Sequence, residues 1–162
     1  MMQLFGEDGG FDYMKGLHAN INQYTKSGSA PIKAAGRGET TIGIVFMHDA
    51  VKQAVAGFPV KVVAPAEGTG YEIGSMSIID GARNMDEAKI FYDWALSADA
   101  QNLALQVNAF QVPSNMGAQT SDSAPDMSSI KLIDYDFKTY GSSATRKRLL
   151  KKWDDEVSVL PQ

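Results

Sequence analysis

The sequence predicts an α/β fold, because apolar runs of strand length alternate with segments of helical periodicity along the chain. The clearest strand is the run of residues 40–47, which is rich in Ile and Val and ends at the polar pair His48 and Asp49. Runs of this kind are typical of buried strands in a parallel sheet. A helical segment, residues 50–56, follows at once. The succession of strand and helix is the unit from which α/β sheets are built.

The bulk composition is that of a globular protein. The chain has 162 residues, of which 44% are hydrophobic and 21% are charged, values near the average for soluble domains. A net charge of -4 gives no electrostatic reason to expect a nucleic acid as partner. The absence of cysteine excludes disulfides, thiolate metal sites and cysteine nucleophiles. The first residues are too short and uncharged for a signal peptide.

Two helices are expected before the key strand. The first follows the glycine-rich residues 6–10, and its apolar positions recur at helical spacing: Phe11, Met14, Leu17 and Ile21. His18 lies on this helix, and we expect it to be a solvated surface residue. The second helix spans residues 29–35, with Ser29 as N-cap and Pro31 in the first turn.

Two further strands are expected after the helix of residues 50–56. One spans residues 60–64 and ends at Pro65, which cannot continue a strand in the middle of a sheet. The other spans residues 73–79. A glycine-rich loop, residues 66–72, separates the two strands.

Helices dominate the rest of the chain. Residues 84–87 have the form of a capping box with Asn in the first position, and they open a helix with one apolar face. Ser97 is expected to cap a second helix that runs to about residue 107. Two more helices are expected at residues 126–133 and 139–157.

The polar pair at the end of the key strand is the first candidate for a binding site. In open α/β sheets, ligands bind in the crevice just past the carboxyl ends of the strands, and His48 and Asp49 stand at that place. Asp49 is equally suited to N-cap the helix that follows. Capping and ligand contact are compatible roles for this carboxylate.

Several segments resemble the extracellular solute-binding proteins of bacterial ABC importers. In residues 93–101 a Leu-Ser junction is followed by a Gln four residues after the Ser, and the further resembling segments are residues 34–44, 68–84, 86–91 and 113–115. Residues 34–44 resemble the branch of iron(III)-binding proteins in particular. The resemblance covers most of residues 5–160. It implies the C-terminal portion of a two-lobed, type II-like fold, in which helices flank a parallel or mixed sheet.

Members of that family are considerably longer, so the chain resembles their C-terminal half. The resemblance implies that residues 1–72 belong to the second lobe, that residues 73–120 cross toward the first lobe, and that residues 121–162 form helices returning to the second. Apolar faces would then lack their packing partner. Because exposing such faces is costly, we expect the isolated half to self-associate.

The pair His48 and Asp49 distinguishes between branches of the family. The ferric-ion branch carries two adjacent tyrosines there, and a hard trivalent cation prefers anionic oxygen. The His-Asp pair instead resembles a sub-branch that takes up phosphorylated organic solutes such as sugar phosphates and aminophosphonates. There the pair and a later Glu, matched here by Glu72, contact hydroxyl or ammonium groups. Since carboxylates repel a phosphate, its contacts are expected at the helix N-terminus that holds Ser27 and Ser29.

The leading hypothesis is therefore a periplasmic, non-catalytic receptor without a resident cofactor, which binds a small molecule and delivers it to a membrane permease. A second hypothesis is a ferric-ion carrier in which Tyr71, Asp49 and Glu72 bind iron(III) together with a synergistic anion. A third is a hydrolase or transferase with His48 as general base. The third ranks low because no nucleophile or glycine-rich phosphate motif stands at a useful spacing.

Overall fold

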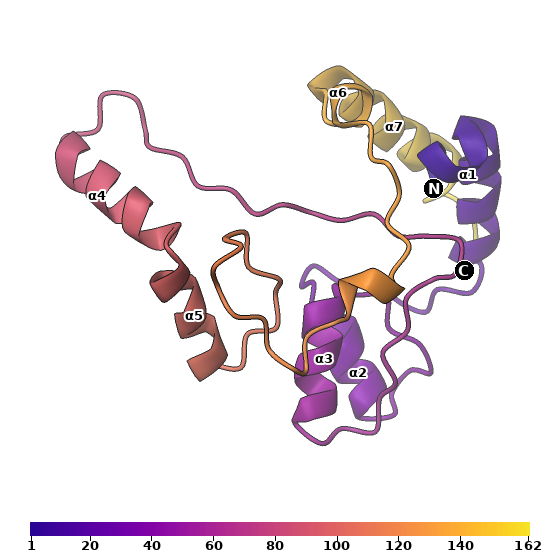
Figure 1. Ribbon diagram of the computed structural model, residues 1–162. Coiled ribbons are helices and arrows are strands. Elements are labelled where there is room, and N and C mark those ends of the chain that lie inside the picture. The colour runs from indigo at the N-terminus through magenta and orange to yellow at the C-terminus, as the bar shows by residue number, and fades with distance from the viewer. The chain divides into compact units, whose positions relative to one another are not determined.

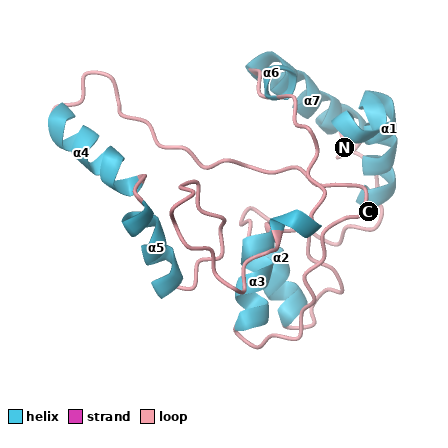
Figure 2. Ribbon diagram, in the orientation of Figure 1, coloured by secondary structure: helices cyan, strands magenta, loops and turns pink.

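The computed structural model describes all 162 residues of the chain, and helices are its regular secondary structure (Figure 2). The one β pairing is an isolated parallel bridge between Thr69 and Leu132. In chain order the helices are α1 (Met2–His18), α2 (Ala30–Gly36), α3 (Met47–Val55), α4 (Met85–Ala95), α5 (Ala98–Gln106), the short 3-10 helix η1 (Met127–Ser129), α6 (Phe137–Tyr140) and α7 (Ser143–Glu156) (Figure 1).

The chain divides into two compact units, which we describe separately. The first unit contains α1, α6 and α7, and it comprises Met1–Thr25, Gly68–Gly70 and Leu132–Gln162. The second unit contains α2 to α5 and η1, and it comprises Lys26–Glu67 and Tyr71–Lys131.

The first unit is held by a small core between α1 and α7. Phe11 and Val157 are fully buried there, and the ammonium group of Lys152 lies 4.5 Å from the centre of the Phe11 ring. An ion pair links the two helices, with Arg148 Nη1 2.6 Å from Glu7 Oε1. The hydrogen bond from Arg148 holds the pKa of the Glu7 carboxyl below its ordinary value. Exposed pairs of this kind contribute little to stability, so the buried apolar side chains carry most of the packing energy.

Two helices of the first unit differ from the sequence-based expectation at their ends. Helix α1 begins at Met2 and bends at Gly6, whose φ of 72° is a conformation that glycine adopts without steric cost. The single helix expected at residues 139–157 is two helices. A new N-cap separates them, because Ser142 Oγ accepts a hydrogen bond from the Thr145 backbone N–H at 3.2 Å and opens α7.

The three predicted strands do not form a sheet in this structure. Residues 42–46, 60–64 and 73–79 run without β pairing (Figure 2). Their large apolar side chains are mostly exposed; examples are Ile42, Ile44, Val63, Ile73 and Ile79. A strand forms only where a second strand satisfies its backbone N–H and C=O groups, and these segments find no such partner. The helical part of the predicted α/β fold is therefore observed and its sheet is not.

Residues 42–46 nevertheless pack closely against α2 through Gly43. A Cβ atom placed on Gly43 would lie 2.8 Å from the carbonyl carbon and oxygen of Pro31 and 3.1 Å from the backbone nitrogen of Ile32. The backbones touch at this point, so only a residue without a side chain fits. Helix α2 lies beside α3 (Figure 1), and Ile32, Ala50 and Val51 are buried in the second unit.

The caps of α4 and α5 illustrate one wrong and one correct expectation. Asn84 precedes α4, but its side chain makes no capping hydrogen bond, so the predicted capping box is not formed. Ser97 caps α5 as predicted, because its hydroxyl oxygen accepts a hydrogen bond from the Ala100 backbone N–H at 3.2 Å. The helix expected at residues 126–133 is reduced to the single turn of η1 (Met127–Ser129).

A polar clasp ties α5 to the segment that follows it. The Gln101 side chain donates to Ser114 Oγ at 2.9 Å and accepts from the Asn115 backbone N–H at 2.9 Å. Asn115 Nδ2 in turn donates to the carbonyl oxygen of Leu96 at 2.8 Å. Two of the motifs that carried the family resemblance, the Gln after the Leu-Ser junction and Pro113-Ser114-Asn115, therefore hold each other in place.

Replacing Gly43 with Ala is expected to lower the free energy of unfolding by about 1–3 kcal/mol, because the new methyl group would overlap the Pro31 backbone and force α2 away. Urea unfolding followed by circular dichroism measures the change. Gly74→Ala is the matched control, since a Cβ at Gly74 meets no atom within 4 Å. Equal effects of the two substitutions would show that the close approach at Gly43 does not exist.

Candidate functional site

The predicted binding residues lie at the N-terminal end of α3. This helix begins at Met47, earlier than the sequence predicts, because the Phe46 carbonyl accepts hydrogen bonds from the N–H groups of Asp49 and Ala50 at 3.1 and 3.3 Å. His48 and Asp49 therefore stand in the first helical turn and not before it. The N-cap is Phe46, so the expected capping role of Asp49 is wrong. A carboxylate in the first turn still interacts favourably with the positive end of the helix dipole.

The imidazole and the carboxylate are neighbours and are partly open to solvent. His48 Nε2 lies 3.9 Å from Asp49 Oδ1, and the two side chains are 30% and 25% exposed. The Phe46 ring stacks on the His48 ring with a centroid distance of 5.6 Å. This stacking restrains the imidazole and leaves its polar atoms available beside the carboxylate.

The segment with the predicted phosphate contacts lies against the same helix end. A Cβ atom on Gly28 would be 3.7 Å from the Phe46 ring, so residues 27–29 pack on the residue that caps α3. Ser29 precedes α2 as predicted, but its hydroxyl makes no capping hydrogen bond and lies 3.5 Å from Ser27 Oγ. The segment that holds Ser27 and Ser29 therefore lies against Phe46, whose ring also stacks on His48. We refer to Ser27, Ser29, His48 and Asp49 as the α3 site.

Glu72 is not drawn into the α3 site. Both Glu72 and Tyr71 are exposed in the segment that follows Gly70, and no ion pair joins Glu72 to His48. No group of three or more His, Asp and Glu side chains lies close enough together to hold a metal ion. The α3 site offers hydroxyl groups, an imidazole and a carboxylate, which together can donate and accept hydrogen bonds. This is a set of groups for binding a polar solute.

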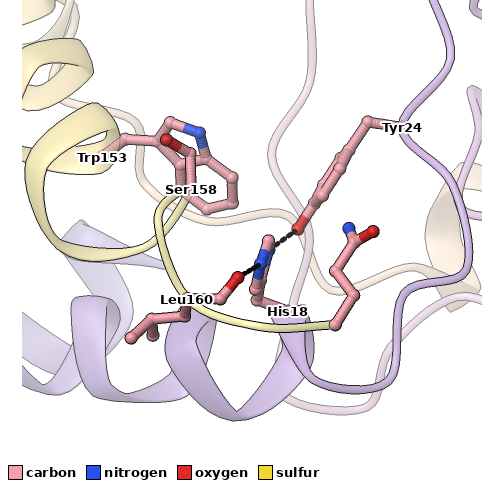
Figure 3. Close-up of a pocket in the computed structure, with 6 residues that line it drawn as sticks. His18, Tyr24, Trp153, Ser158 and Leu160 are labelled. Atoms are coloured by element: carbon pink, nitrogen blue, oxygen red, sulfur yellow. Dashed lines mark hydrogen bonds between the residues drawn. The ribbon is translucent and has the colours of Figure 1, made fainter.

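A hollow lies in the first unit, and sequence reasoning missed it (Figure 3). The cavity measures about 650 Å³ and is lined by His18, Tyr24, Trp153, Ser158, Leu160 and Gln162. His18 is only 3% exposed, so the expectation of a solvated surface histidine is wrong. The sequence held a signal for its burial. His18 stands seven residues after the buried Phe11, on the same face of the helix.

Both ring nitrogens of His18 are engaged (Figure 3). Nε2 lies 3.0 Å from the Leu160 carbonyl oxygen, and Nδ1 lies 2.9 Å from the Tyr24 hydroxyl. A carbonyl only accepts, so Nε2 donates; in a neutral imidazole Nδ1 then accepts from the tyrosine. Burial raises the pKa of the Tyr24 hydroxyl, which keeps the phenol protonated as the donor. With no free nitrogen, His18 fastens the C-terminal segment to α1.

Comparison with known proteins decides the family. Residues 1–139 of the chain match the model of a protein family described as "Bacterial extracellular solute-binding protein". The chain belongs to this family of bacterial extracellular solute-binding proteins. The resemblance predicted from the sequence is thereby confirmed.

Solved structures of periplasmic binding proteins share the fold of this family member. AfuA from Actinobacillus pleuropneumoniae, solved with exogenous fructose-6-phosphate bound, is 52% identical with a TM-score of 0.91, and the alignment covers 98% of this chain and 50% of AfuA. The periplasmic binding protein P5PA is 39% identical with a TM-score of 0.88, over 97% of this chain and 50% of P5PA. An uncharacterized protein of Haemophilus influenzae strain Rd is 48% identical over 159 residues, which are 98% of this chain and 46% of that protein.

The chain therefore spans about half the length of the relatives that it matches. This agrees with the expected portion of a two-lobed fold. None of its helices combines the length and apolar composition that crossing a membrane requires.

Replacing His18 with Ala is expected to release the C-terminal segment, because the substitution removes both hydrogen bonds of the ring. The Leu160 amide, which donates to the Val157 carbonyl, should then exchange with solvent deuterium faster. Hydrogen exchange read by NMR or mass spectrometry measures the effect. The matched variant Tyr24→Phe removes one hydroxyl and should cost only about 1 kcal/mol of stability. Unchanged exchange at Leu160 in the His18→Ala variant would contradict the fastening role.

Proposed function

We propose that this chain supplies the ligand-binding half of a periplasmic receptor that serves an ABC importer and binds a sugar phosphate. The observation that carries the proposal is that the segment of Ser27 and Ser29 packs on Phe46, the N-cap of the helix whose first turn holds His48 and Asp49. The chain is 52% identical to a protein solved with fructose-6-phosphate. Aminophosphonates, the other solutes implied by the His-Asp pair, are a less supported choice.

The chemistry of the α3 site suits the two ends of such a ligand. The Asp49 carboxylate accepts hydrogen bonds from sugar hydroxyls, and the His48 imidazole donates one and accepts one. Glu72, the third residue implied for this end, is exposed and outside the α3 site in this structure. A phosphate would avoid the carboxylates and be held at the Ser27 and Ser29 end. Hydroxyl groups there, 3.5 Å apart, can donate to phosphate oxygens.

The other hypotheses fit less well. A ferric-ion carrier needs Tyr71, Asp49 and Glu72 to converge, and the relative whose ligand is named holds a sugar phosphate. An enzyme needs a reacting group beside His48, while the relatives with named roles are binding proteins. The periplasmic location, the permease partner, and the lobe boundaries at residues 72 and 120 belong to the proposal. Self-association of the isolated half gains no support from the relatives and stays a prediction.

The test uses this chain completed with the half of AfuA that it does not span. His48→Ala and Asp49→Asn should each weaken fructose-6-phosphate binding by about 10- to 100-fold, because each removes a hydrogen bond to a polar or charged group. Isothermal titration calorimetry measures the affinity. Lys52→Ala, an exposed position on the same helix, is the control and should leave the affinity unchanged.

Two further titrations separate the ends of the ligand. The double variant Ser27→Ala with Ser29→Ala should weaken binding of both fructose-6-phosphate and inorganic phosphate, whereas His48→Ala should affect the sugar phosphate alone. A phenolate-to-iron colour on adding iron(III), with no heat from fructose-6-phosphate, would instead establish the ferric carrier. Wild-type affinity for the sugar phosphate in the His48 and Asp49 variants would refute the α3 site.

A further inference from the structure

The chain has two histidines, and each stacks on an aromatic ring in nearly the same geometry. The rings of His18 and Tyr24 have a centroid distance of 5.7 Å and an angle of 19° between their planes. The rings of His48 and Phe46 have a centroid distance of 5.6 Å and an angle of 17°. The two stacks differ in the polar part of the partner, because Tyr24 carries a hydroxyl group and Phe46 carries none.

This difference decides how much of each imidazole is left for a ligand. At His18 the Tyr24 hydroxyl and the Leu160 carbonyl occupy both ring nitrogens. At His48 no hydrogen bond engages either nitrogen, since Asp49 Oδ1 lies 3.9 Å from Nε2, which is beyond hydrogen-bond distance. His48 therefore keeps one donor and one acceptor, in either tautomer, for a bound molecule.

Building on the proposed function, we infer that Phe46 is a positioning residue for ligand binding, which orients the His48 imidazole and leaves both of its nitrogens to the ligand. A side chain that is free to rotate loses that freedom when a ligand immobilises it, and this loss weakens the affinity. His48 is 30% exposed, and the stacked ring orients it before the ligand arrives. Stacking does this without occupying a nitrogen, whereas a hydroxyl partner would occupy one.

Phe46 is well placed for this role because its own position is set from two directions. Its backbone forms the N-cap of α3, where its carbonyl accepts hydrogen bonds from the N–H groups of Asp49 and Ala50. Its ring lies beside Gly28, where a Cβ atom would be 3.7 Å away. The start of the helix thus fixes Phe46, and the Phe46 ring in turn fixes the plane of the imidazole.

The first experiment is a double-mutant cycle in the completed receptor described above, with fructose-6-phosphate as ligand and calorimetry as readout. Phe46→Leu keeps an apolar side chain and removes the ring, so it should weaken binding by about 3- to 10-fold, because the ligand must then order His48 itself. In the His48→Ala background the same substitution should change the affinity by less than ~2-fold. Phe46→Trp, which retains an aromatic face, should bind like the unsubstituted receptor.

Phe58→Leu is the matched control. The Phe58 side chain is 42% exposed, compared with 50% for Phe46, and it packs on Gly36 of α2. The same chemical change is thereby made at a ring that does not stack on a histidine. This variant should leave the affinity for fructose-6-phosphate unchanged.

The second experiment needs no ligand and uses this chain by itself. A stacked aromatic ring perturbs the NMR chemical shifts of the protons on the imidazole beside it. The shifts of the His48 ring protons should therefore change in Phe46→Leu and stay unchanged in Phe58→Leu. If Phe46→Leu fails to fold, Phe46→Met takes its place in both experiments.

Three results would overturn the inference. They are unchanged His48 shifts in Phe46→Leu, unchanged affinity in Phe46→Leu, and equal weakening in the presence and absence of the His48 imidazole, which would mean that Phe46 acts independently of it. An unsubstituted receptor that binds no fructose-6-phosphate would instead refute the proposed function. The His48 shifts would then decide by themselves whether Phe46 orients the imidazole.

Discussion

The structure reflects a difference in backbone hydrogen bonding: a helix forms its hydrogen bonds within one segment, whereas a strand needs a second segment as partner. An α-helix satisfies its backbone groups from residues four positions away, so α3 and α7 form from local sequence. A strand satisfies none of its groups by itself. The helices of this chain, which spans half the length of its relatives, therefore form all of their internal backbone hydrogen bonds. Strand-like segments such as residues 42–46 remain unpaired and expose their apolar side chains.

The same difference explains which sequence-based expectations held. Helix positions were predictable because periodicity and caps are local, as the cap formed by Ser97 illustrates. One expected cap failed because the helix starts earlier, so that Phe46 took the place expected for Asp49. Ser29 and Asn84 do stand at the N-cap, but their side chains make no capping hydrogen bond. The sheet could not be predicted for this chain, because a pattern of β-branched residues identifies a segment that prefers to pair and says nothing about whether its partner is present.

Prediction of the site followed the same line. His48 and Asp49 were candidates because they adjoin an apolar run, and the packing of the Ser27–Ser29 segment on Phe46 required the structure. His18 was misplaced because its burial depends on C-terminal residues such as Leu160, 142 positions away in sequence. Tertiary contacts of this range leave only a faint trace in local periodicity.

The clasp around Gln101 has a consequence for which side chain can occupy that position. Its amide nitrogen donates a hydrogen bond to the Ser114 hydroxyl, and its amide oxygen accepts one from the Asn115 backbone N–H. A glutamate carboxylate would keep the accepting oxygen but would add a negative charge and offer no N–H donor. A lysine ammonium group has no acceptor atom, and an asparagine side chain is one methylene shorter. Position 101 is thus suited to glutamine, whose side chain carries both a donor and an acceptor at the required length.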